Sequence, residues 1–483
     1  MLLTGKSHSI SIARRASRDV FLWVLCFLVA NYVRFEEFFK LNNYLLSVGM
    51  GALGLVVTAY IFGMYSVESR GGSRFFAHGL LFTTAFLIAL LVVTIVGYVD
   101  FGTRVGRGFM ALAVSMAYPL LLLHHWAMFN KHRLAPERVA FVAESLNEMA
   151  EYQRIKELDP RGIEIVGRID ISGAPSQGDL LGRIKHVSRL ISRHKIDRIV
   201  FPDARLDDEQ ARSYLRQLRY SGKTCTPLIS LCEEYLQYVP LHLVTTEWLM
   251  HSESSPRELY FRKVKRTFDV LTSLALLVLL SPALLVGICI VKFFSPEGPL
   301  FFRQERVGRF GKHFQILKLR SMRTDAEKNG PQWSSVSGDS RVFPCGAFLR
   351  RYRIDEIPQL INILRGDMSF VGPRPEQPVF VETLAKVLPF YEERHMIHPG
   401  LTGWAQVSYP YGATTGDAHC KLEYDLYYLK HAGITFDLLI LLDTVRVVLI
   451  GGMKRAAQRP RYPTTISGPL ETAETKIVEE AIA

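Results

Sequence analysis

Four apolar blocks separated by short polar segments open the chain, at residues 20–33, 44–64, 79–99 and 109–126. The last three approach the length of about 20 residues that an α-helix needs to cross a bilayer. The first block is shorter and contains Asn31. No small-residue cleavage site follows it and further apolar blocks come soon after, which argues against a cleaved signal peptide. The pattern predicts four transmembrane helices within residues 1–130.

Basic residues mark the two ends of this region. They are Lys6, Arg14, Arg15 and Arg18 before the first block, and Lys131, Arg133 and Arg138 after the fourth. Because positive charge favours the cytoplasmic side, both ends are expected inside, as an even number of spans requires.

Short apolar runs alternate with helical stretches in the next region, which we predict to be a Rossmann-like α/β cytoplasmic domain over residues 135–250. The expected strands are VAFVA (139–143), IEIVG (163–167) and RIVFP (198–202), and the expected helices cover residues 180–194 and 207–221. A dinucleotide site would need glycines in the turn after the first strand, but that turn reads AESLNE. The domain is therefore expected to be a scaffold or a regulatory element without a nucleotide.

A further uncharged run covers residues 270–291 and is interrupted by Ser281-Pro282. Proline removes a backbone donor near the centre of the run, and the serine hydroxyl can satisfy a freed carbonyl. Basic residues flank both ends of the run, so both ends are expected on the cytoplasmic side. These features predict a re-entrant helix that enters one leaflet and returns. A proline-kinked spanning helix is the alternative.

Composition narrows the classes of partner. The 483 residues carry a formal net charge of +12, and nearly half of them are apolar. The basic residues gather beside apolar blocks rather than among aromatic residues, which favours membrane lipids over nucleic acid. Six cysteines without a CxxC pair indicate free thiols in a reducing compartment.

Adjacent carboxylates, Asp355 and Glu356, stand in the stretch RIDEIPQLINILRGDMSFVGPRPE (353–376). Pro358 follows them, as is typical of the first turn of a helix, so one carboxylate could simply cap that helix. The surroundings favour phosphate chemistry, because one carboxylate could attack phosphorus while the other holds a divalent cation. Nearby phosphate-seeking donors are Lys318, Arg320, Arg350, Arg351, Arg353 and Arg374.

Three long blocks in this order resemble the bacterial polyprenyl-phosphate sugar-phosphate transferases, the initiating phosphoglycosyl transferases of exopolysaccharide and O-antigen synthesis. The blocks are GPLFFRQERVGRFGKHFQILKLRSM, LRRYRIDEIPQLINILRGDMSFVGPRPE and RHMIHPGLTGWAQVSYPYG. The resemblance implies a mainly helical catalytic domain with the re-entrant helix, over residues 260–455. The amino-terminal regions are similar in architecture to the large membrane form of the family, and the chain is most similar to its exosortase-linked branch.

The resemblance also implies the chemistry. Asp355 would attack the β-phosphate of a UDP-sugar, release UMP and hold the sugar phosphate, which undecaprenyl phosphate would then accept. Glu356 would coordinate Mg²⁺. Lys318, Arg350 and Arg374 would bind the phosphates, with Arg303 and Gln304 as further candidates. The enzyme would lie in the bacterial cytoplasmic membrane, with its catalytic domain on the cytoplasmic face.

The remaining segments are less specific. Turns around Trp404 would explain residues 394–412 structurally, with Arg394 and Gln406 as substrate-facing candidates. His395 and His398 are not expected to bind a metal, because no carboxylate or cysteine stands at ligand spacing around them. Residues 421–449 are expected to form a helix in the membrane interface or over the catalytic core. The polar tail, residues 456–483, is expected to be flexible.

Two other functions fit parts of the pattern. An ordinary glycosyl transferase would move the sugar without its phosphate and release UDP. A membrane scaffold would dock an assembly complex through the α/β domain and would not need Asp355. The sequence leaves the sugar open, with glucose or galactose suggested only by the large-form resemblance, and leaves open whether the chain is a homodimer.

Overall fold

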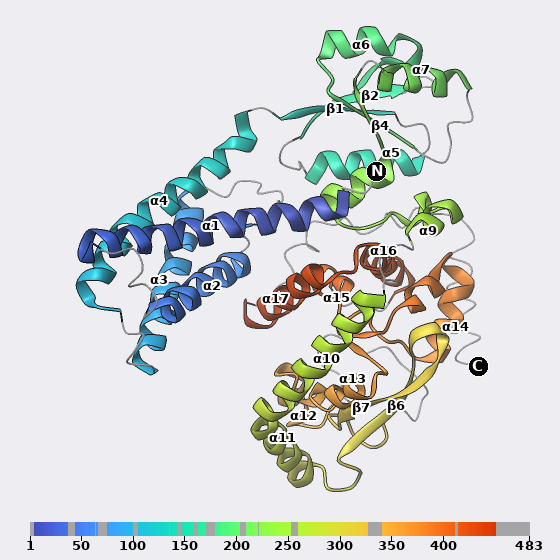
Figure 1. Cartoon of the computed structure of the whole chain (residues 1–483). Helices are drawn as coiled ribbons and strands as arrows, with labels where there is room; N and C mark the ends of the chain where they lie inside the picture. The colour runs from blue at the N-terminus through green and yellow to red at the C-terminus, as the bar shows by residue number, and fades with distance from the viewer. Residues whose placement is uncertain are drawn as a thin grey trace. The chain divides into compact units, whose positions relative to one another are not determined.

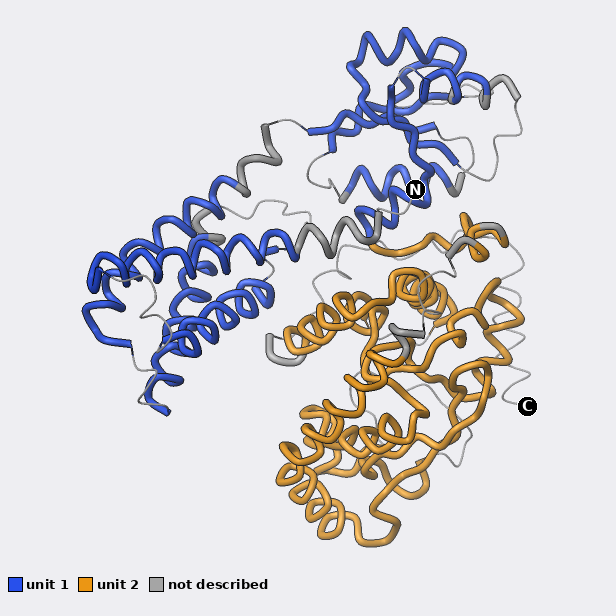
Figure 2. The backbone as a smooth tube through the Cα atoms, in the orientation of Figure 1, with its two compact units in different colours: residues 1–236 blue, residues 237–483 orange. Residues whose placement is uncertain are grey.

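A computed structural model describes residues 4–36, 44–62, 64–65, 75–99, 105–134, 136–142, 146–158, 163–170, 179–202, 209–220, 222–252, 259–326, 341–410 and 414–450. The chain divides into two compact units, residues 1–236 and 237–483 (Figure 2). The predicted tail at residues 456–483 lies outside the described residues.

The first unit begins with four helices, α1 (Thr4–Phe35), α2 (Leu45–Ile61), α3 (Phe75–Val99) and α4 (Arg107–Leu134) (Figure 1). Three of them contain apolar segments long enough to cross a membrane: Ala13–Phe35, Gly79–Val99 and Arg107–Ala127. The remaining helix, α2, is apolar but has only 17 residues. That corresponds to about 26 Å of helix, whereas the hydrocarbon core of a bilayer is about 30 Å thick. The structure thus supports three spans by length, and the predicted count of four stays a prediction.

Packing nevertheless holds α2 within this group of helices. The indole N–H of Trp23 in α1 donates a hydrogen bond to the Val48 carbonyl of α2 at 3.1 Å. A Cβ atom at Gly51 would stand 2.4 Å from the Val93 side chain of α3, so glycine is what allows the two helices to approach closely.

The α/β region of the first unit contains a five-stranded parallel sheet, which confirms the predicted combination of helices with a parallel sheet. The strands are β1 (Glu137–Val142), β2 (Ile163–Asp170), β3 (Leu180–Arg183), β4 (Arg198–Phe201) and β5 (Thr224–Pro227), in the order β3-β2-β1-β4-β5. The helices are α5 (Leu146–Leu158), α6 (Val187–His194), α7 (Glu209–Tyr220) and α8 (Leu228–Leu231), and a π-helical turn, η5 (Cys232–Leu236), ends the unit.

Helices cover both faces of this sheet (Figure 1). Ala140 and Val142 of β1 belong to a buried cluster with residues of α6 and α7. Phe141 points to the other face and packs its ring against Tyr152 of α5, with ring centroids 5.2 Å apart. This alternation of side chains is the burial expected for a parallel strand between two helical layers.

One predicted helix was partly wrong. Residues 180–194 form β3, a single 3-10 turn (η3, Ile184–His186) and then α6. Gly182 in β3 has φ of 152°. Residues other than glycine rarely adopt this backbone angle, and it does not occur inside an α-helix. The local backbone therefore excludes the longer helix that the apolar spacing suggested.

The second unit is mainly helical with two small sheets. Its helices are α9 (Thr246–Ser252), α10 (Leu259–Leu279), α11 (Ser281–Phe294), α12 (Gly346–Arg351), α13 (Gln359–Arg365), α14 (Pro378–Val387), α15 (Trp404–Ser408), α16 (Thr415–His431) and α17 (Ile434–Ile450). Short 3-10 turns are η6 (Leu241–Leu243), η7 (Arg309–Gly311), η8 (Ile354–Glu356) and η9 (Tyr391–Met396). An antiparallel hairpin joins β6 (Phe301–Val307) to β7 (His313–Leu319), and β8 (Ser369–Val371) runs parallel to β9 (Gly400–Thr402).

The predicted break at Ser281-Pro282 is confirmed, because α10 and α11 are bent by 61° at that point. Both arms pack on the same body of the second unit. Asp269 of α10 accepts a hydrogen bond from the backbone N–H of Phe370, while Gly287 of α11 lies against Leu319 and Ile354. Side chains near the bend are exposed and apolar, among them Leu271, Val278, Leu279 and Leu285.

Candidate active site

The carboxylate pair lies in η8, directly after a residue with unusual backbone angles. Arg353 has φ of 58° and ψ of 21°, in the left-handed region that a residue with a side chain rarely adopts. The following helix, α13, starts at Gln359 with Pro358 at its cap position and no capping side chain. Pro358 thus precedes the helix, and neither carboxylate serves as its cap. Neither negative charge is therefore used to cap α13.

Burial separates the two carboxyl groups electrostatically. Asp355 is 7% exposed, and its Oδ1 has no hydrogen-bond partner among the described residues. Burial and the neighbouring Glu356 raise the pKa of Asp355 to about 6, although Lys318, Arg350 and Arg353 oppose this shift. At neutral pH it is then a desolvated carboxylate, which is a more reactive state than a hydrated one.

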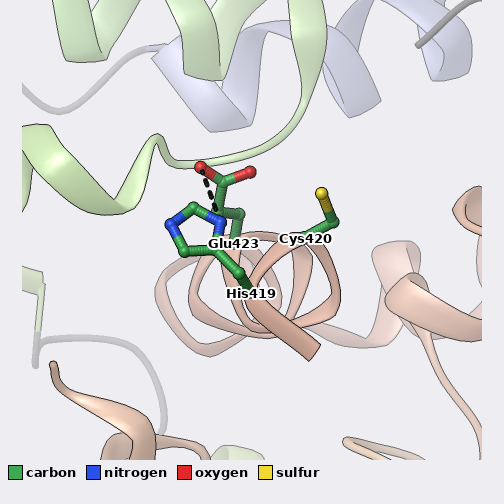
Figure 3. A group of neighbouring side chains, drawn as sticks. All are labelled: His419, Cys420 and Glu423. Carbon is green, nitrogen blue, oxygen red and sulfur yellow. Dashed lines mark ion pairs between the residues drawn. The ribbon is translucent and has the colours of Figure 1, made fainter. Parts of the chain in front are cut away.

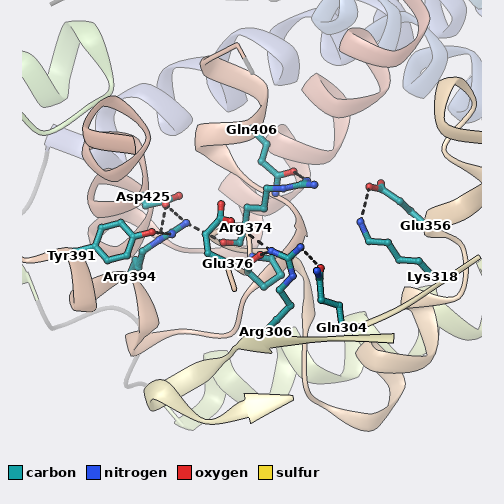
Figure 4. Close-up of polar contacts among 11 residues, drawn as sticks. Gln304, Arg306, Lys318, Glu356, Arg374, Glu376, Tyr391, Arg394, Gln406 and Asp425 are labelled. Atoms are coloured by element: carbon teal, nitrogen blue, oxygen red, sulfur yellow. Dashed lines mark hydrogen bonds and ion pairs between the residues drawn. The ribbon is translucent and has the colours of Figure 1, made fainter. Parts of the chain in front are cut away.

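Glu356 shifts in the opposite direction. Burial would raise its pKa, but Lys318, Arg353 and Arg374 outweigh burial and hold it at about 2. The Glu356 carboxylate lies 3.7 Å from Lys318 Nζ and 3.1 Å from Arg353 Nη1. Figure 4 shows the Lys318 side chain reaching toward Glu356. The Asp355–Glu356 dyad therefore places a carboxyl group of raised pKa beside a carboxylate that is ionised at neutral pH.

Strand register decides which hairpin residues share the face of Lys318. In the β6–β7 pairing, Phe302 stands opposite Lys318 and Gln304 stands opposite Ile316, so Gln304 and Lys318 project from the same face. Arg303 alternates to the other face, opposite Leu317. Of the two weaker candidates on β6, the structure groups Gln304 with Lys318 and places Arg303 on the opposite face.

Arg320 is buried and hydrogen-bonded to the backbone, unlike the other basic residues near the dyad. It is 4% exposed, and its guanidinium donates a hydrogen bond to the Ser295 carbonyl after α11. A Cβ atom at Gly298 would collide with Arg320 Nη1. This side chain is packed into the connection between α11 and β6, whereas Arg350, on α12, acts electrostatically on Asp355.

A second polar group adjoins the dyad and is built around Arg374 of the Pro-Arg-Pro turn (Figure 4). Arg374 Nη1 donates to Gln406 Oε1 at 3.3 Å, and its backbone carbonyl accepts from Arg394 Nη2 at 3.0 Å. Arg394 Nη2 also lies 2.8 Å from Asp425, and its Nη1 donates to the Tyr391 hydroxyl at 2.7 Å. These contacts fix the turn that carries Arg374.

Polar and aromatic side chains line a pocket at this second group. The lining includes Arg306, Arg374, Glu376, Phe380, Tyr391, Arg394, Gln406, Tyr409, Lys421 and Asp425. Arg394 and Gln406, the two substrate-facing candidates of the third sequence block, both belong to it. Sequence reasoning did not select Arg306, Tyr391, Lys421 or Asp425.

Arg306 connects the pocket to the hairpin. Its Nη2 donates to Gln304 Oε1 at 2.6 Å, its Nη1 donates to the Pro375 carbonyl at 3.1 Å, and it lies 3.6 Å from Glu376. Two-residue alternation from Gln304 along β6 could have identified Arg306. Asp425 could not have been identified in the same way, because it is one of many buried residues on α16 and no sequence pattern distinguishes it from them.

The dyad fits a divalent cation of the magnesium type. Mg²⁺ is commonly held by one or two carboxylates together with substrate phosphates and water. Glu356 is ionised and Asp355 Oδ1 is a buried oxygen without a hydrogen-bond partner among the described residues. Burial lowers the pKa of His395 and of His398 to about 4, so both imidazoles are neutral at pH 7, and the expectation that they bind no metal stays a prediction.

Comparison with known proteins gives matches mainly to this unit. The family model described as "Bacterial sugar transferase" matches residues 260–451. The chain is 43% identical over 188 residues to a protein of Aeromonas hydrophila named "UDP-N-acetylgalactosamine-undecaprenyl-phosphate N-acetylgalactosaminephosphotransferase", covering 39% of this chain and 44% of that one. It is 32% identical over 291 residues to the "UDP-glucose:undecaprenyl-phosphate glucose-1-phosphate transferase" of Escherichia coli (strain K12), covering 59% and 61%.

A shorter relative is covered almost completely. The chain is 38% identical over 187 residues to the "Exopolysaccharide production protein PSS" of Rhizobium leguminosarum bv. phaseoli, which is 38% of this chain and 93% of that protein. The match to the two larger relatives spans less than two thirds of their lengths.

Proposed function

The chain belongs to the bacterial sugar transferase family, and from this premise we propose that it transfers a sugar 1-phosphate from a UDP-sugar to undecaprenyl phosphate and releases UMP. The reaction would be a first membrane step of exopolysaccharide or O-antigen synthesis. The observation that carries the proposal is the dyad: a buried carboxylate with a raised pKa stands beside an ionised one, among several cations.

In the first step, an oxygen of the Asp355 carboxylate attacks the β-phosphorus of the UDP-sugar. The bond between that phosphorus and the oxygen bridging to the α-phosphate breaks, and UMP leaves with the electron pair. The sugar phosphate stays on Asp355 as an acyl phosphate. Burial supports this role, because a carboxylate that has lost its water shell is a stronger nucleophile, while a pKa of about 6 keeps it mostly ionised at neutral pH.

In the second step, a phosphate oxygen of undecaprenyl phosphate attacks the same phosphorus. The bond to the Asp355 oxygen breaks, which regenerates the carboxylate and gives undecaprenyl diphosphate-sugar. Both steps pass charge through the phosphoryl oxygens, so cations placed around the phosphorus stabilise both transition states.

The basic side chains around the dyad suit this task. Lys318 acts electrostatically on both carboxylates, and Arg374 acts on Glu356 and Lys318. We assign Lys318, Arg350 and Arg374 to the donor diphosphate and to the acceptor phosphate. Arg374 is held by Gln406 and, through its carbonyl, by Arg394, so its guanidinium needs little ordering when a phosphate arrives.

A bound Mg²⁺ would offset the diphosphate charge. We assign it to Glu356, with Asp355 Oδ1 as a neighbouring oxygen. Lys318 and Arg353 position the Glu356 carboxylate by direct contact.

The pocket beside Arg374 is the candidate site for the rest of the donor. It offers cations, two carboxylates and the aromatic rings of Tyr391 and Tyr409, which can accommodate a nucleoside and a sugar. The relatives named above act, by their names, on UDP-N-acetylgalactosamine and UDP-glucose. Both sugars therefore belong in a donor panel with UDP-galactose.

The acceptor is a lipid, and the bent pair α10–α11 supports its delivery from the membrane. Both arms contact the same body of the second unit, which is difficult for a helix whose ends lie on opposite sides of a bilayer. We propose that the pair is re-entrant, with the active site at the cytoplasmic surface of the bacterial inner membrane. Positive residues at both flanks support that orientation.

The test is the identity of the released nucleotide. Purified protein in nanodiscs, with undecaprenyl phosphate, Mg²⁺ and the donor panel, should release UMP with one of the sugars. Asp355→Ala should abolish that release. Release of UDP would establish ordinary glycosyl transfer instead, and unchanged polysaccharide synthesis in cells carrying Asp355→Ala would favour the scaffold function.

A further inference from the structure

Three side chains of types that can bind a metal ion lie together on α16: His419, Cys420 and Glu423. Their potential ligand atoms all lie within 4.8 Å of one another, and no other group of this kind occurs among the described residues. Cys420 and Glu423 are three residues apart and His419 and Glu423 are four apart, so helical geometry brings both toward the carboxylate. Figure 3 shows the Glu423 carboxylate between the imidazole and the thiol in that view.

The group is enclosed on most sides but reachable from one. Glu423 is 0% exposed and Cys420 is 5% exposed, whereas the His419 side chain is 21% exposed. An ordinary cluster of surface acids would have solvent-screened carboxylates. Here a fully buried carboxylate stands 3.9 Å from an imidazole nitrogen and close to a buried thiol.

Neighbouring groups orient these side chains. The backbone N–H of Leu241 donates a hydrogen bond to Glu423 Oε1 at 3.1 Å, and the Cys420 side chain hydrogen-bonds with the Tyr409 hydroxyl. Metal-binding side chains commonly have such outer contacts, which set their direction before the ion arrives. None of the six cysteines forms a disulfide, so the Cys420 sulfur is not part of a disulfide bond.

We propose that His419, Cys420 and Glu423 bind a transition-metal ion of the Zn²⁺ type, at a site separate from the Asp355–Glu356 dyad. An imidazole nitrogen, a thiolate and a carboxylate are the ligands that zinc prefers, at metal–ligand distances of about 2.0–2.3 Å. A tetrahedral ion with those distances separates its ligand atoms by about 3.3–3.6 Å. The imidazole and carboxylate, at 3.9 Å, need to close by about 0.5 Å, and the ligand atoms as a group, which lie within 4.8 Å of one another, by about 1.5 Å at most. Binding displaces the thiol proton to solvent, and the fourth position stays open for water.

The position of the site indicates a bracing role. The chain that leads into η6 is bound to this part of α16 twice, because Val239 N–H donates to the Glu423 carbonyl at 3.2 Å and the N–H of Leu241, the first residue of η6, donates to the Glu423 carboxylate. Residues two apart on a helix face nearly opposite directions. Lys421 and Asp425 therefore point away from the metal group and line the candidate donor pocket. An ion on one side of α16 would stiffen the helix that presents Asp425 on the other.

The experiment measures metal content and affinity in the full chain, purified without a polyhistidine tag. We expect about one zinc ion per chain and, after replacement by Co²⁺, a near-ultraviolet thiolate-to-metal absorption band. Cys420→Ser should remove the band, and His419→Gln should weaken Zn²⁺ binding by about tenfold or more. Cys225→Ser is the matched control, because Cys225 lies on β5 in the first unit and outside the group.

Each result decides the question. A Co²⁺ band that survives in Cys420→Ser, or a wild-type zinc content no higher than that of Cys420→Ser, would overturn the proposal and leave an i,i+4 ion pair on α16. If Cys420→Ser fails to fold, His419→Gln decides, because the partly exposed His419 can change without disturbing the core. The readout is independent of transferase activity, so the proposed function can fail while the metal site stands.

Discussion

Asp355 and Glu356 are adjacent in sequence, yet their surroundings drive their pKa values apart. Burial dominates at Asp355, whereas three cations overcome burial at Glu356. The difference follows from direction, because η8 turns Asp355 into the body of the unit and Glu356 toward Lys318 and Arg353. Two like side chains thereby acquire two roles, as is usual where one residue reacts and another holds charge.

The first prediction is that neutralising the two carboxylates changes stability in opposite directions. Asp355 has a folded pKa of about 6 against an ordinary 3.8, so its ionisation opposes folding above about pH 4 and fully above pH 6, by about 3 kcal/mol. Glu356 has a folded pKa of about 2 against 4.5, so its ionisation favours folding above pH 4.5 by a similar amount. At pH 7.5, Asp355→Asn should raise the apparent Tm and Glu356→Gln should lower it.

Thermal unfolding of the detergent-purified variants at pH 7.5 and pH 4.5 tests this. The advantage of Asp355→Asn should shrink at the lower pH, because wild-type Asp355 is then largely protonated in the folded state. The two substitutions remove one charge each from neighbouring positions, so each serves as the control for the other. Equal shifts of the same sign would contradict the opposed environments.

The second prediction uses the alternation of the hairpin. Lys318→Gln should lower kcat/KM by about a hundredfold or more, because it removes a cation from the phosphorus site. Arg303→Gln removes the same charge from the neighbouring strand but from the other face, and it should retain most activity. Steady-state rates with varied UDP-sugar make the comparison. Equal losses would show that the face of the hairpin does not matter.

From the sequence alone, residues could be grouped by their local neighbours, but the direction in which each side chain points could not be predicted, and the roles of these residues stay predictions. The acidic pair and Arg374 carry recognisable neighbours, and the structure brings them into electrostatic contact with Lys318. Arg303 and Arg320 carry the same guanidinium, but one projects from the opposite face and the other is packed against the Ser295 carbonyl. Composition does not reveal direction. The two-residue period of β6 would have separated Gln304 from Arg303 and added Arg306.

At the scale of elements, a buried ion pair holds the strand that leads into the Arg374 turn. Lys265 of α10 contacts Asp437 of α17, and its Nζ donates to the Val371 carbonyl of β8 at 3.2 Å. The Tyr428 hydroxyl of α16 donates to the same carbonyl at 3.1 Å. Four elements thus meet three residues before Arg374, and their packing determines where that side chain stands.

The third prediction follows from this pair. Lys265→Met should leave Asp437 as a buried, uncompensated carboxylate, which costs about 3–5 kcal/mol. We expect a lower apparent Tm and a reduced kcat, because the Arg374 turn loses its support. Lys263→Met is the matched control, since Lys263 is exposed two residues earlier on the same helix. Equal behaviour of the two variants would remove the positioning role.

The boundaries of helices and strands could likewise be predicted where a local residue determines them, and not where tertiary pairing does. Ser281-Pro282 predicted the bend between α10 and α11 because proline acts on its own turn. Strands β1, β2 and β4 were marked by compact β-branched runs. Strand β3 was missed because its apolar residues also suit a helix, and pairing with β2 decides its conformation.

At the scale of the whole molecule, the question is how the second unit meets the bilayer. The bent pair exposes apolar side chains near its break, and α11 ends with exposed Phe293 and Phe294. Exposed apolar surface of this kind is stable when lipid covers it. Both arms also contact the same body, which favours entry into and return from one leaflet. The predicted domain boundaries and the count of four amino-terminal spans stay predictions.

The fourth prediction concerns sidedness. In a cysteine-free chain, Lys263→Cys before the bend and Glu297→Cys after it place thiols at two exposed charged positions. A membrane-impermeant maleimide should label neither in intact spheroplasts and both after permeabilisation, because a re-entrant pair keeps both ends cytoplasmic. The two variants control for each other. Labelling of only one of them in intact cells would establish a spanning helix.

The central claim is that Asp355 carries the sugar phosphate between donor and acceptor. The fifth prediction is that the chain, mixed with its UDP-sugar and no lipid acceptor, releases one equivalent of UMP and gains the mass of one sugar phosphate. After acid quench and tryptic digestion, the added mass should lie on residues 354–365 and should disappear when undecaprenyl phosphate is supplied before the quench. Asp355→Asn should show neither the burst nor the adduct. Nucleotide release that occurs only with the lipid present, with no adduct on this peptide, would contradict the covalent mechanism.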